Sequence, residues 1–114
     1  MTDVAHGRLL SPSAAPEHGE RTEAVASVTG AVIEQIVSGA LAGPVDYDQD
    51  HDEWALVLAG AAVLDVAGVR LDLAAGDWVL LPAHVPHRLV HAAPGTNWLT
   101  VRGGPPADTH RPPQ

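Results

Sequence analysis

Two histidines four residues apart, His87 and His91, follow a corner fixed by Pro86 and could do chemistry together. The segment 87–91 reads as a short strand, and an even spacing places both rings on the same face of a strand. Two imidazoles on one face can bind a metal ion or transfer a proton. Histidine pairs in strands also commonly form a solvated or hydrogen-bonded face, so the spacing alone leaves both interpretations open.

A second set of chemically active side chains lies upstream, where residues 46–53 hold five carboxylates. If this segment is extended, Tyr47, Gln49, His51 and Glu53 share one face and the aspartates lie on the other. Carboxylate, amide and imidazole donors together suit a borderline divalent cation such as Zn, Ni, Mn or Fe(II). The alternative is a solvated acidic loop, which is the usual role of such a charge run.

Short strands must position these residues. Apolar runs rich in Val, Leu and Ile alternate with Gly, Pro and Asp turns, a pattern typical of an all-β sandwich or barrel. A helix within residues 22–39 also fits the spacing of Val25, Val32 and Ile36, but the β-branched content and Gly30 favour two strands. The expected strands span residues 24–29, 31–38, 54–59, 61–67, 69–73, 78–81, 87–91 and 98–101.

The composition limits the classes of partner. The chain has 114 residues, enough for one domain with one core, and its 14 acidic and 6 basic residues give a net charge of −8. That charge argues against a nucleic acid and against an anionic membrane surface. Cysteine is absent, which excludes disulfides and thiolate metal sites. Phenylalanine is also absent, so we assign Trp54, Trp78 and Trp98 to a core built mainly from aliphatic side chains.

The two ends of the chain differ in composition from its middle. Residues 1–21 and 103–114 are rich in Pro, Gly and Ser and show no hydrophobic period. We therefore expect disordered arms that add little stability, flanking one folded domain over residues 22–102. The first residues lack the pattern of a targeting signal, and the longest apolar run, Trp54–Leu64, is too short to span a bilayer as a helix. These features favour a cytoplasmic protein, and pairing of exposed strand edges in a homodimer would protect them.

The two chemical segments together resemble the paired motifs of the cupin family, which are small β-barrels of the jelly-roll type. Glu53 and Gly60 match the Glu-x6-Gly half of the first cupin motif. Gly76, Pro82 and His87 match the second motif, whose second Gly and Asn are replaced here by His84 and His91. The resemblance covers about residues 33–101. It is closest to small stand-alone cupins in which a string like that of Tyr47–Trp54 precedes the barrel.

The resemblance implies a jelly-roll fold with a divalent metal in the mouth of the barrel. Cupins usually hold the metal with two His and a Glu from the first motif and one His from the second. Glu53 and His87 fall at two of those positions, whereas the His-x-His positions hold Tyr47 and Gln49 or, in the other register, two aspartates. Gln49 and His51 are therefore the further candidate ligands. Tyr47 and His91 are expected to line the pocket.

Three classes of function follow from this interpretation, because a fold does not by itself imply a function. The first is a metal-dependent oxygenase, isomerase or lyase that acts on a small acid, diketone or sugar. The second is a binding or sensing module that holds a small molecule without catalysis. The third is an accessory protein with a degraded metal site. The first two classes imply a small oxygenated ligand, and the third implies a partner molecule. In none of the three is the partner a nucleic acid.

Overall fold

Strands make up most of the regular structure in residues 4–103, the part of the chain that the computed structural model describes. The all-β prediction is thereby confirmed, and β2 and β7 have the predicted bounds. None of the described residues forms a helix long and apolar enough to cross a membrane. The elements are η1 (Pro12–Ala14, a 3-10 helix), β1 (Glu20–Val28), β2 (Ala31–Ser38), β3 (Val45–Tyr47), β4 (Glu53–Ala59), β5 (Ala61–Val66), β6 (Val69–Ala74), β7 (Trp78–Leu81), β8 (His87–Ala92) and β9 (Asn97–Gly103).

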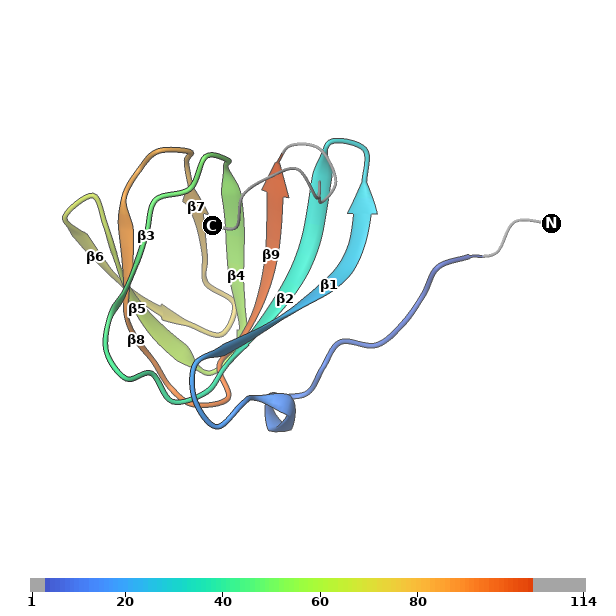
Figure 1. The fold of residues 1–114 in the computed structure, drawn as a ribbon, viewed down its shortest axis with the longest axis horizontal. Helices are drawn as coiled ribbons and strands as arrows, with labels where there is room; N and C mark the ends of the chain where they lie inside the picture. The colour runs from blue at the N-terminus through green and yellow to red at the C-terminus, as the bar shows by residue number, and fades with distance from the viewer. Residues whose placement is uncertain (1–3, 104–114) are drawn as a thin grey trace.

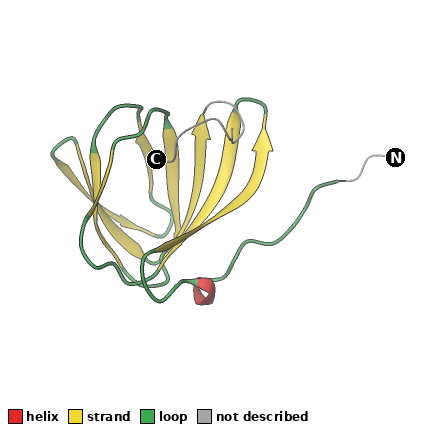
Figure 2. Ribbon diagram, viewed as in Figure 1, coloured by secondary structure: helices red, strands yellow, loops and turns green. Residues whose placement is uncertain are grey.

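Two antiparallel sheets face each other as the two layers of a jelly roll (Figures 1 and 2). The large sheet has the order β1-β2-β9-β4-β7, and the small sheet has the order β3-β8-β5-β6. Val57 and Trp98 from the large sheet pack with Leu64 and Leu89 from the small sheet to form the core. The side chains alternate along each strand, so every strand that contributes to this core also presents a second set of side chains outward.

The turn between β5 and β6 shows how local sequence sets the register of the small sheet. Ala67 and Gly68 both have positive φ, at 50° and 84°, and they form a two-residue loop between paired Val66 and Val69. Two successive residues with positive φ are the signature of a type I′ turn, whose twist matches that of the flanking strands. The hairpin is therefore closed tightly, although alanine is not the residue that this turn prefers.

The three tryptophans do not share one environment. Trp98 is 5% exposed and lies in the core as predicted. The assignment of Trp78 to the core is wrong, because this side chain is 60% exposed. The assignment of Trp54 to the core is wrong as well, because Trp54 is only partly buried and lies on the outward face of β4 opposite exposed Leu80. Its ring centroid lies 6.3 Å from that of Trp78. In β7 the inward positions belong to Val79 and Leu81, so strand alternation turns Trp78 to the outside.

The segment before β1 is attached to the barrel. The backbone N–H of Leu10 donates to Gln35 Oε1 at 2.8 Å, and the Leu10 carbonyl accepts from Gln35 Nε2 at 2.8 Å and Asn97 Nδ2 at 3.2 Å. β1 itself begins at Glu20, two residues before the expected domain boundary. Hydrogen bonds to a buried glutamine are long-range contacts that the composition of the segment does not reveal. Of the arms expected to be disordered, residues 1–21 and 103–114, the parts 1–3 and 104–114 lie outside the described residues.

Removing residues 1–10 is expected to lower the free energy of unfolding by about 2 kcal/mol, because Gln35 and Asn97 lose their Leu10 partners. Gln35 is only 1% exposed, so water replaces those partners poorly. Urea denaturation of the full and shortened chains measures the difference. A chain that lacks only residues 1–8 keeps Leu10 and is the matched control, expected to match the full chain. Equal stability of all three chains would show that the Leu10 contacts contribute nothing.

Candidate functional site

A cavity of about 90 Å³ lies between the two sheets, several times the volume that one water molecule needs. Its apolar lining comes from Ile36, Ala55, Leu64, Leu81, Leu89 and Trp98. Its polar lining comes from Glu20, Tyr47, Gln49, Glu53, His87 and Thr100. A mostly apolar wall with a few convergent polar groups is the usual composition of a small-molecule site. The cavity therefore contains four of the six residues expected from the sequence to form the site.

Glu53 brings a carboxylate into this cavity from the first position of β4. Burial raises its pKa above the ordinary value of 4.5, and the charge of Glu34 raises it further. The nearby His51 and Arg102, together with a hydrogen bond from Gln49, act in the opposite direction and lower the pKa. The net effect is a carboxyl group whose ionised form is poorly solvated. Such a group gains free energy from a cation or a proton donor placed beside it.

Gln49 lies next to Glu53 in the loop between β3 and β4. Its side-chain hydrogen bond lowers the pKa of the Glu53 carboxyl, so the Nε2 amide group is the donor. Gln49 Oε1 is buried and finds no hydrogen-bond partner among the described residues. The loop is held by the N–H of His84, which donates to the Gln49 carbonyl at 2.7 Å. His84 has a φ of 62°, which explains why the corresponding position of the second cupin motif is usually Gly.

His87 reaches the same cavity from the first position of β8 and is 7% exposed. Its Nδ1 lies 3.2 Å from the carbonyl oxygen of Val85, and a carbonyl can only accept, so Nδ1 carries the proton. Nε2 is then left with a free lone pair in the neutral ring. A backbone carbonyl that fixes the tautomer in this way is the usual support of a metal-binding histidine, and it equally suits a general base.

Tyr47 connects His87 to a carboxylate that the sequence did not reveal. The Tyr47 ring stacks on His87 with centroids 5.4 Å apart, and its hydroxyl donates to Glu20 Oε1 at 3.0 Å. Ser38 Oγ donates to the other oxygen, Glu20 Oε2, at 2.8 Å. Burial and the Glu20 carboxylate raise the pKa of Tyr47 well above its ordinary value, so the hydroxyl remains a donor. Glu20 falls in the segment expected to be a disordered arm, and no local motif singles it out.

His91 does not line the cavity, and the prediction that it shares a face with His87 is wrong. The pairing of β8 with β5 shifts by one residue, with Val63 opposite His91 but Leu64 opposite Leu89. This bulge at Val90 interrupts the alternation, so His87 is buried and His91 is exposed. Parity predicts a shared face only along an unbroken strand.

His51 also lies outside the cavity lining, although its side chain is only 9% exposed. Its Nδ1 contacts Asp50 Oδ1 at 3.0 Å. The reason is local, because β3 ends at Tyr47 and β4 begins at Glu53. The residues between them form a loop, in which strand parity no longer applies. Tyr47, Gln49 and Glu53 nevertheless line the cavity, as predicted for an extended segment.

The donors at the cavity resemble only part of a usual site for a divalent metal ion. No group of three or more His, Asp or Glu side chains in residues 4–103 is arranged to hold one. The cavity supplies one carboxylate, one imidazole with a free Nε2, and the unpaired amide oxygen of Gln49. These three groups fit a borderline cation in type, although the amide is a weaker ligand than imidazole. Glu53, His87 and Gln49 are therefore the residues that would hold a metal.

In metal-free protein, replacing Glu53 with Gln is expected to flatten the dependence of stability on pH. The raised pKa means that the folded state binds more protons than the unfolded state between pH 4.5 and the folded-state value. Stability of the wild type therefore falls as the pH rises through this window and stays lower above it. Glu53→Gln keeps the shape and removes the ionisation. Thermal melts from pH 4 to pH 8 in chelator provide the comparison, and parallel curves for the two proteins would contradict the assignment.

The chain is similar to several proteins of known structure and to one protein family. No curated protein matches the chain. A protein from Ralstonia eutropha JMP134 described as a "putative mannose-6-phosphate isomerase" is 30% identical, with a TM-score of 0.71 over 88% of this chain and 98% of that one. A cupin superfamily protein from Desulfitobacterium hafniense DCB-2 is 25% identical, with a TM-score of 0.67 over 90% and 95% of the two chains.

KdgF from Halomonas sp. shares the fold at 21% identity, with a TM-score of 0.67 over 75% of this chain and 78% of that one. The cupin domain family matches residues 32–101, which include Glu53 and His87 and all strands from β3 to β8. The match agrees with the two facing sheets and with the positions of both residues at one cavity. On these grounds the chain belongs to the cupin family.

Proposed function

We propose that the barrel cavity binds a small oxygenated molecule, and that Glu53, His87 and Gln49 hold a divalent metal ion at its polar end. The observation that carries this proposal is the convergence of three donors without full partners on one cavity. Glu53 is poorly solvated, His87 has a free Nε2, and Gln49 Oε1 has no partner among the described residues. One cation satisfies all three requirements at once.

The size and charge of the cavity narrow the ligand class. A volume of about 90 Å³ admits a ligand of only a few non-hydrogen atoms. No Arg side chain lines the cavity among the described residues, and the chain contains no Lys. The cavity therefore offers a phosphate group no cationic side chain, so we propose a hydroxylated or carbonyl compound rather than the sugar phosphate named for the Ralstonia protein.

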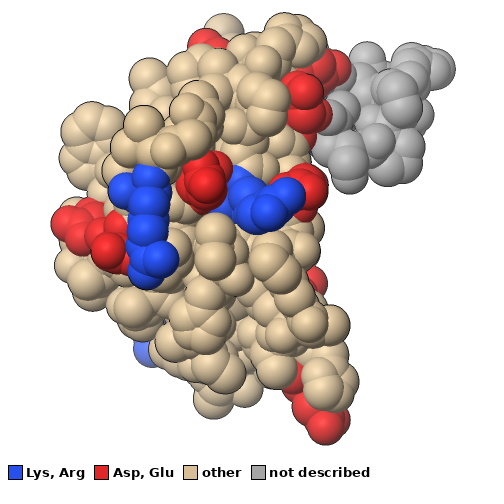
Figure 3. All heavy atoms as spheres, turned by 90° about the vertical axis from the view of Figure 1, so that its left-hand side faces the viewer, with Lys and Arg blue, Asp and Glu red and all other residues tan. Residues whose placement is uncertain are grey.

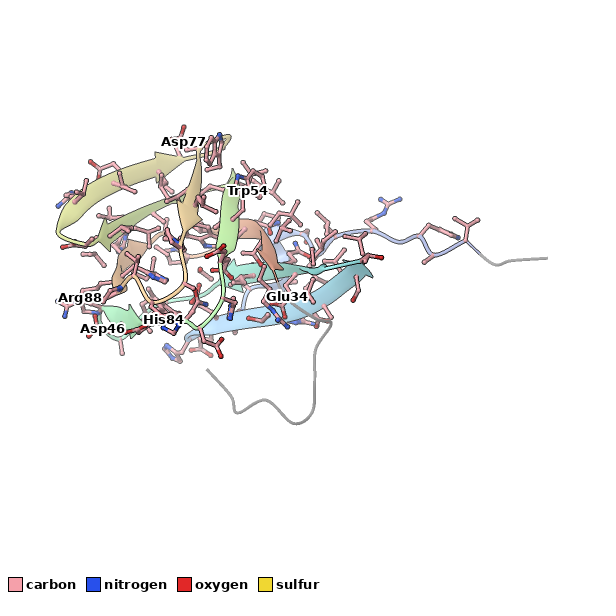
Figure 4. All side chains as sticks on the ribbon, turned by 90° about the horizontal axis from the view of Figure 1, so that it is seen from above. Glu34, Asp46, Trp54, Asp77, His84 and Arg88 are labelled. Carbon is pink, nitrogen blue, oxygen red and sulfur yellow. The ribbon has the colours of Figure 1, made fainter. Side chains whose placement is uncertain are left out.

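Two arginines near the cavity are paired with carboxylates. Arg102, opposite Glu53 in the sheet, has its Nε 3.2 Å from Glu34 Oε1. Arg88 Nε donates to Asp46 Oδ1 at 2.6 Å, and the two side chains point toward one another in Figure 4. They line a wider groove of about 630 Å³ that shares Tyr47 and His87 with the cavity. Asp48 and Asp65 also line this groove. An anion approaching along it would meet more carboxylates than cations, which further favours an uncharged ligand.

The chain's own groups define the chemistry that is available. Trp98 lines the cavity, and its indole N–H has no acceptor among the described residues, so it can donate to a ligand oxygen. His87 Nε2 can accept a proton, and the stacked Tyr47 keeps the ring in place. A bound metal would supply Lewis acidity toward a carbonyl or hydroxyl oxygen. These roles suit proton transfer next to a carbonyl, as in isomerases and lyases, and they equally suit binding without turnover.

A second candidate is a binding module that works without metal. The composition of the donor set favours it. Among the described residues the cavity offers only two of the side chains that usually bind metals, Glu53 and His87, and its third donor is the weaker amide oxygen of Gln49. In that case a protonated Glu53 donates a hydrogen bond to the ligand, which the raised pKa of its carboxyl makes easier. The two candidates differ in whether ligand affinity depends on added metal.

The test compares His87→Ala with His91→Ala, two substitutions in the same strand. The wild type is expected to bind about one equivalent of Zn²⁺ or Ni²⁺, measured by competition with a coloured chelator. His87→Ala should lose at least tenfold in affinity, whereas His91→Ala, which changes an exposed ring outside the cavity, should bind like the wild type.

Melting curves in chelator check that both variants keep the apo fold. Equal loss of affinity in both variants, or in neither, would contradict the proposed metal site. If the wild type binds no metal, binding of small hydroxylated and carbonyl compounds to metal-free protein, detected by a shift in melting temperature, supports the second candidate.

A further inference from the structure

The cavity holds a second carboxylate, Glu20, that the proposed metal site does not use. Glu20 is the first residue of β1 and lies opposite Ser38 of β2 in the sheet register. It lines the cavity together with Glu53. The family match begins at residue 32, so Glu20 lies outside both cupin motifs. The contacts that it makes in this chain are therefore the guide to its role.

Glu20 and Glu53 reach the cavity from opposite ends of the barrel. β1 runs antiparallel to β2, β2 to β9 and β9 to β4, so β1 and β4 begin at opposite ends. Figure 1 shows β4 starting at the top of the barrel and β1 starting at the bottom. Half of the residues that line the cavity are apolar, among them Leu64 and Leu89. A ligand that satisfies both carboxylates must therefore carry polar groups at two places.

Two hydroxyl groups hold the Glu20 carboxylate. Tyr47 Oη donates to its Oε1 at 3.0 Å, and Ser38 Oγ donates to its Oε2 at 2.8 Å. Ser38 is fully buried, and the Tyr47 ring is fixed further by stacking on His87. A carboxylate offers about four acceptor sites, of which these two bonds occupy about half. Glu20 therefore keeps acceptor capacity for a further donor at the cavity.

No cationic side chain forms an ion pair with Glu20 in the part of the chain that the structure describes. Arg21, its neighbour in sequence, pairs instead with Glu23 at 2.7 Å. The arginines of the small sheet pair with surface aspartates, and Figure 3 shows blue and red side chains beside one another on that side. A ligand carboxylate or phosphate beside Glu20 would therefore be repelled by an uncompensated charge.

The donor that suits this position is a hydroxyl group. A ketone or ether oxygen only accepts, so it would face the Glu20 oxygens without a hydrogen bond. An ammonium group would lose its strong hydration against the apolar part of the lining. A hydroxyl group is neutral and donates one hydrogen bond, as the hydroxyls of Tyr47 and Ser38 already do.

We propose that Glu20 is a specificity-determining residue, which accepts a hydrogen bond from a hydroxyl group of the ligand. This inference rests on the proposed binding function of the cavity and narrows its ligand class. The ligand is a hydroxyketone or a polyol, with one hydroxyl for Glu20 and a second oxygen for the end of the cavity near Glu53. Simple ketones, diketones and keto acids are poor ligands, because none of them brings a neutral hydroxyl donor. The assignment holds with or without metal, since Glu20 is not one of the three proposed metal ligands.

Hydroxyacetone and butanone are the two probes, because they differ only by a hydroxyl in place of a methyl group of similar size. NMR of isotope-labelled protein follows binding through the indole N–H of Trp98, which lines the cavity. The indoles of Trp54 and Trp78, which do not line the cavity, are the internal references. The wild type should bind hydroxyacetone at least about tenfold more tightly than butanone, because a site with an unused acceptor discriminates against a ligand without the donor.

Three variants separate the effect of Glu20 on the ligand from its effect on its neighbours. Glu20→Gln leaves one acceptor oxygen, which the Tyr47 and Ser38 hydroxyls use, so the preference should fall to about threefold or less. Glu17→Gln is the matched control, because the Glu17 side chain is 90% exposed, and it should keep the wild-type preference. Tyr47→Phe removes one partner of Glu20 but retains the carboxylate, so it should also keep the preference.

The outcomes distinguish this inference from the proposed function. Equal binding of the two probes by the wild type would overturn the role of Glu20 and leave the proposed function standing. A preference that persists in Glu20→Gln would overturn it too. Loss of the preference in Tyr47→Phe as well as in Glu20→Gln would show that Glu20 acts only by positioning Tyr47. If neither probe moves the Trp98 signal of the wild type, both the proposed function and this inference are wrong.

Discussion

Replacing Gln49 with His is expected to raise the affinity of the protein for Zn²⁺ or Ni²⁺ by at least about tenfold, or about 1.4 kcal/mol. Gln49 lines the cavity with Glu53 and His87 and offers a buried, unpaired amide oxygen. An imidazole nitrogen is a stronger ligand for these metals than an amide oxygen. The substitution also brings the site nearer to the ligand set that the cupin resemblance implies.

Competition with a chelator measures the effect on the wild type, on Gln49→His, on Glu53→Ala and on the double variant. The gain should disappear when Glu53 is replaced, because ligands of one site are energetically coupled. His51→Ala is the discriminating control, since His51 lies outside the cavity lining. If Gln49→His changes nothing while His51→Ala abolishes binding, the loop rearranges to use His51 and our choice of ligand is wrong.

Replacing Gly60 with Ala is expected to destabilise the protein more than replacing Gly76 with Ala, and by the largest amount of any substitution proposed here. Gly60 and Gly76 have almost the same φ, 91° and 92°, which L-residues rarely adopt. A Cβ at Gly76 would meet no atom within 4 Å, so Gly76→Ala should cost about 1–2 kcal/mol from backbone strain alone. A Cβ at Gly60 would lie 2.5 Å from Thr96 Oγ1 and 2.8 Å from Thr96 Cα. Gly60→Ala should therefore cost roughly 3–5 kcal/mol.

Thr96 has little freedom to relieve that clash. It is fully buried, and its Oγ1 lies 2.6 Å from the Ala93 carbonyl oxygen and 3.0 Å from that of Ala61, so its single hydroxyl proton is shared between two acceptors. Equilibrium urea unfolding of both variants gives the two free energies on one scale. Equal losses for the two glycines would mean that Thr96 yields, and that backbone conformation alone explains the Gly at the end of the Glu-x6-Gly motif.

Local sequence determined the strands and turns because their signals are local. Alternation, β-branched residues and Gly or Pro punctuation act within a few residues, and they placed β2 and β7 at their observed bounds. The spacing within each motif also predicted Glu53 and His87 as site residues. Each is the first residue of a strand, β4 and β8 respectively, and the turns before these strands fix where they begin. Gln49 and Tyr47 followed from parity with Glu53.

The rest depended on contacts between residues far apart in the chain. His91 turned outward because β5 imposes a bulge on β8, and no feature of residues 87–91 encodes it. Glu20 joined the site because Tyr47 and Ser38 bind it across 27 and 18 residues. Trp78 is apolar on either face of a strand, so only the packing of β7 in the sheet decided that it lies outside. Local pattern thus sets which residues form strands, and the pairing of those strands sets which side chains meet.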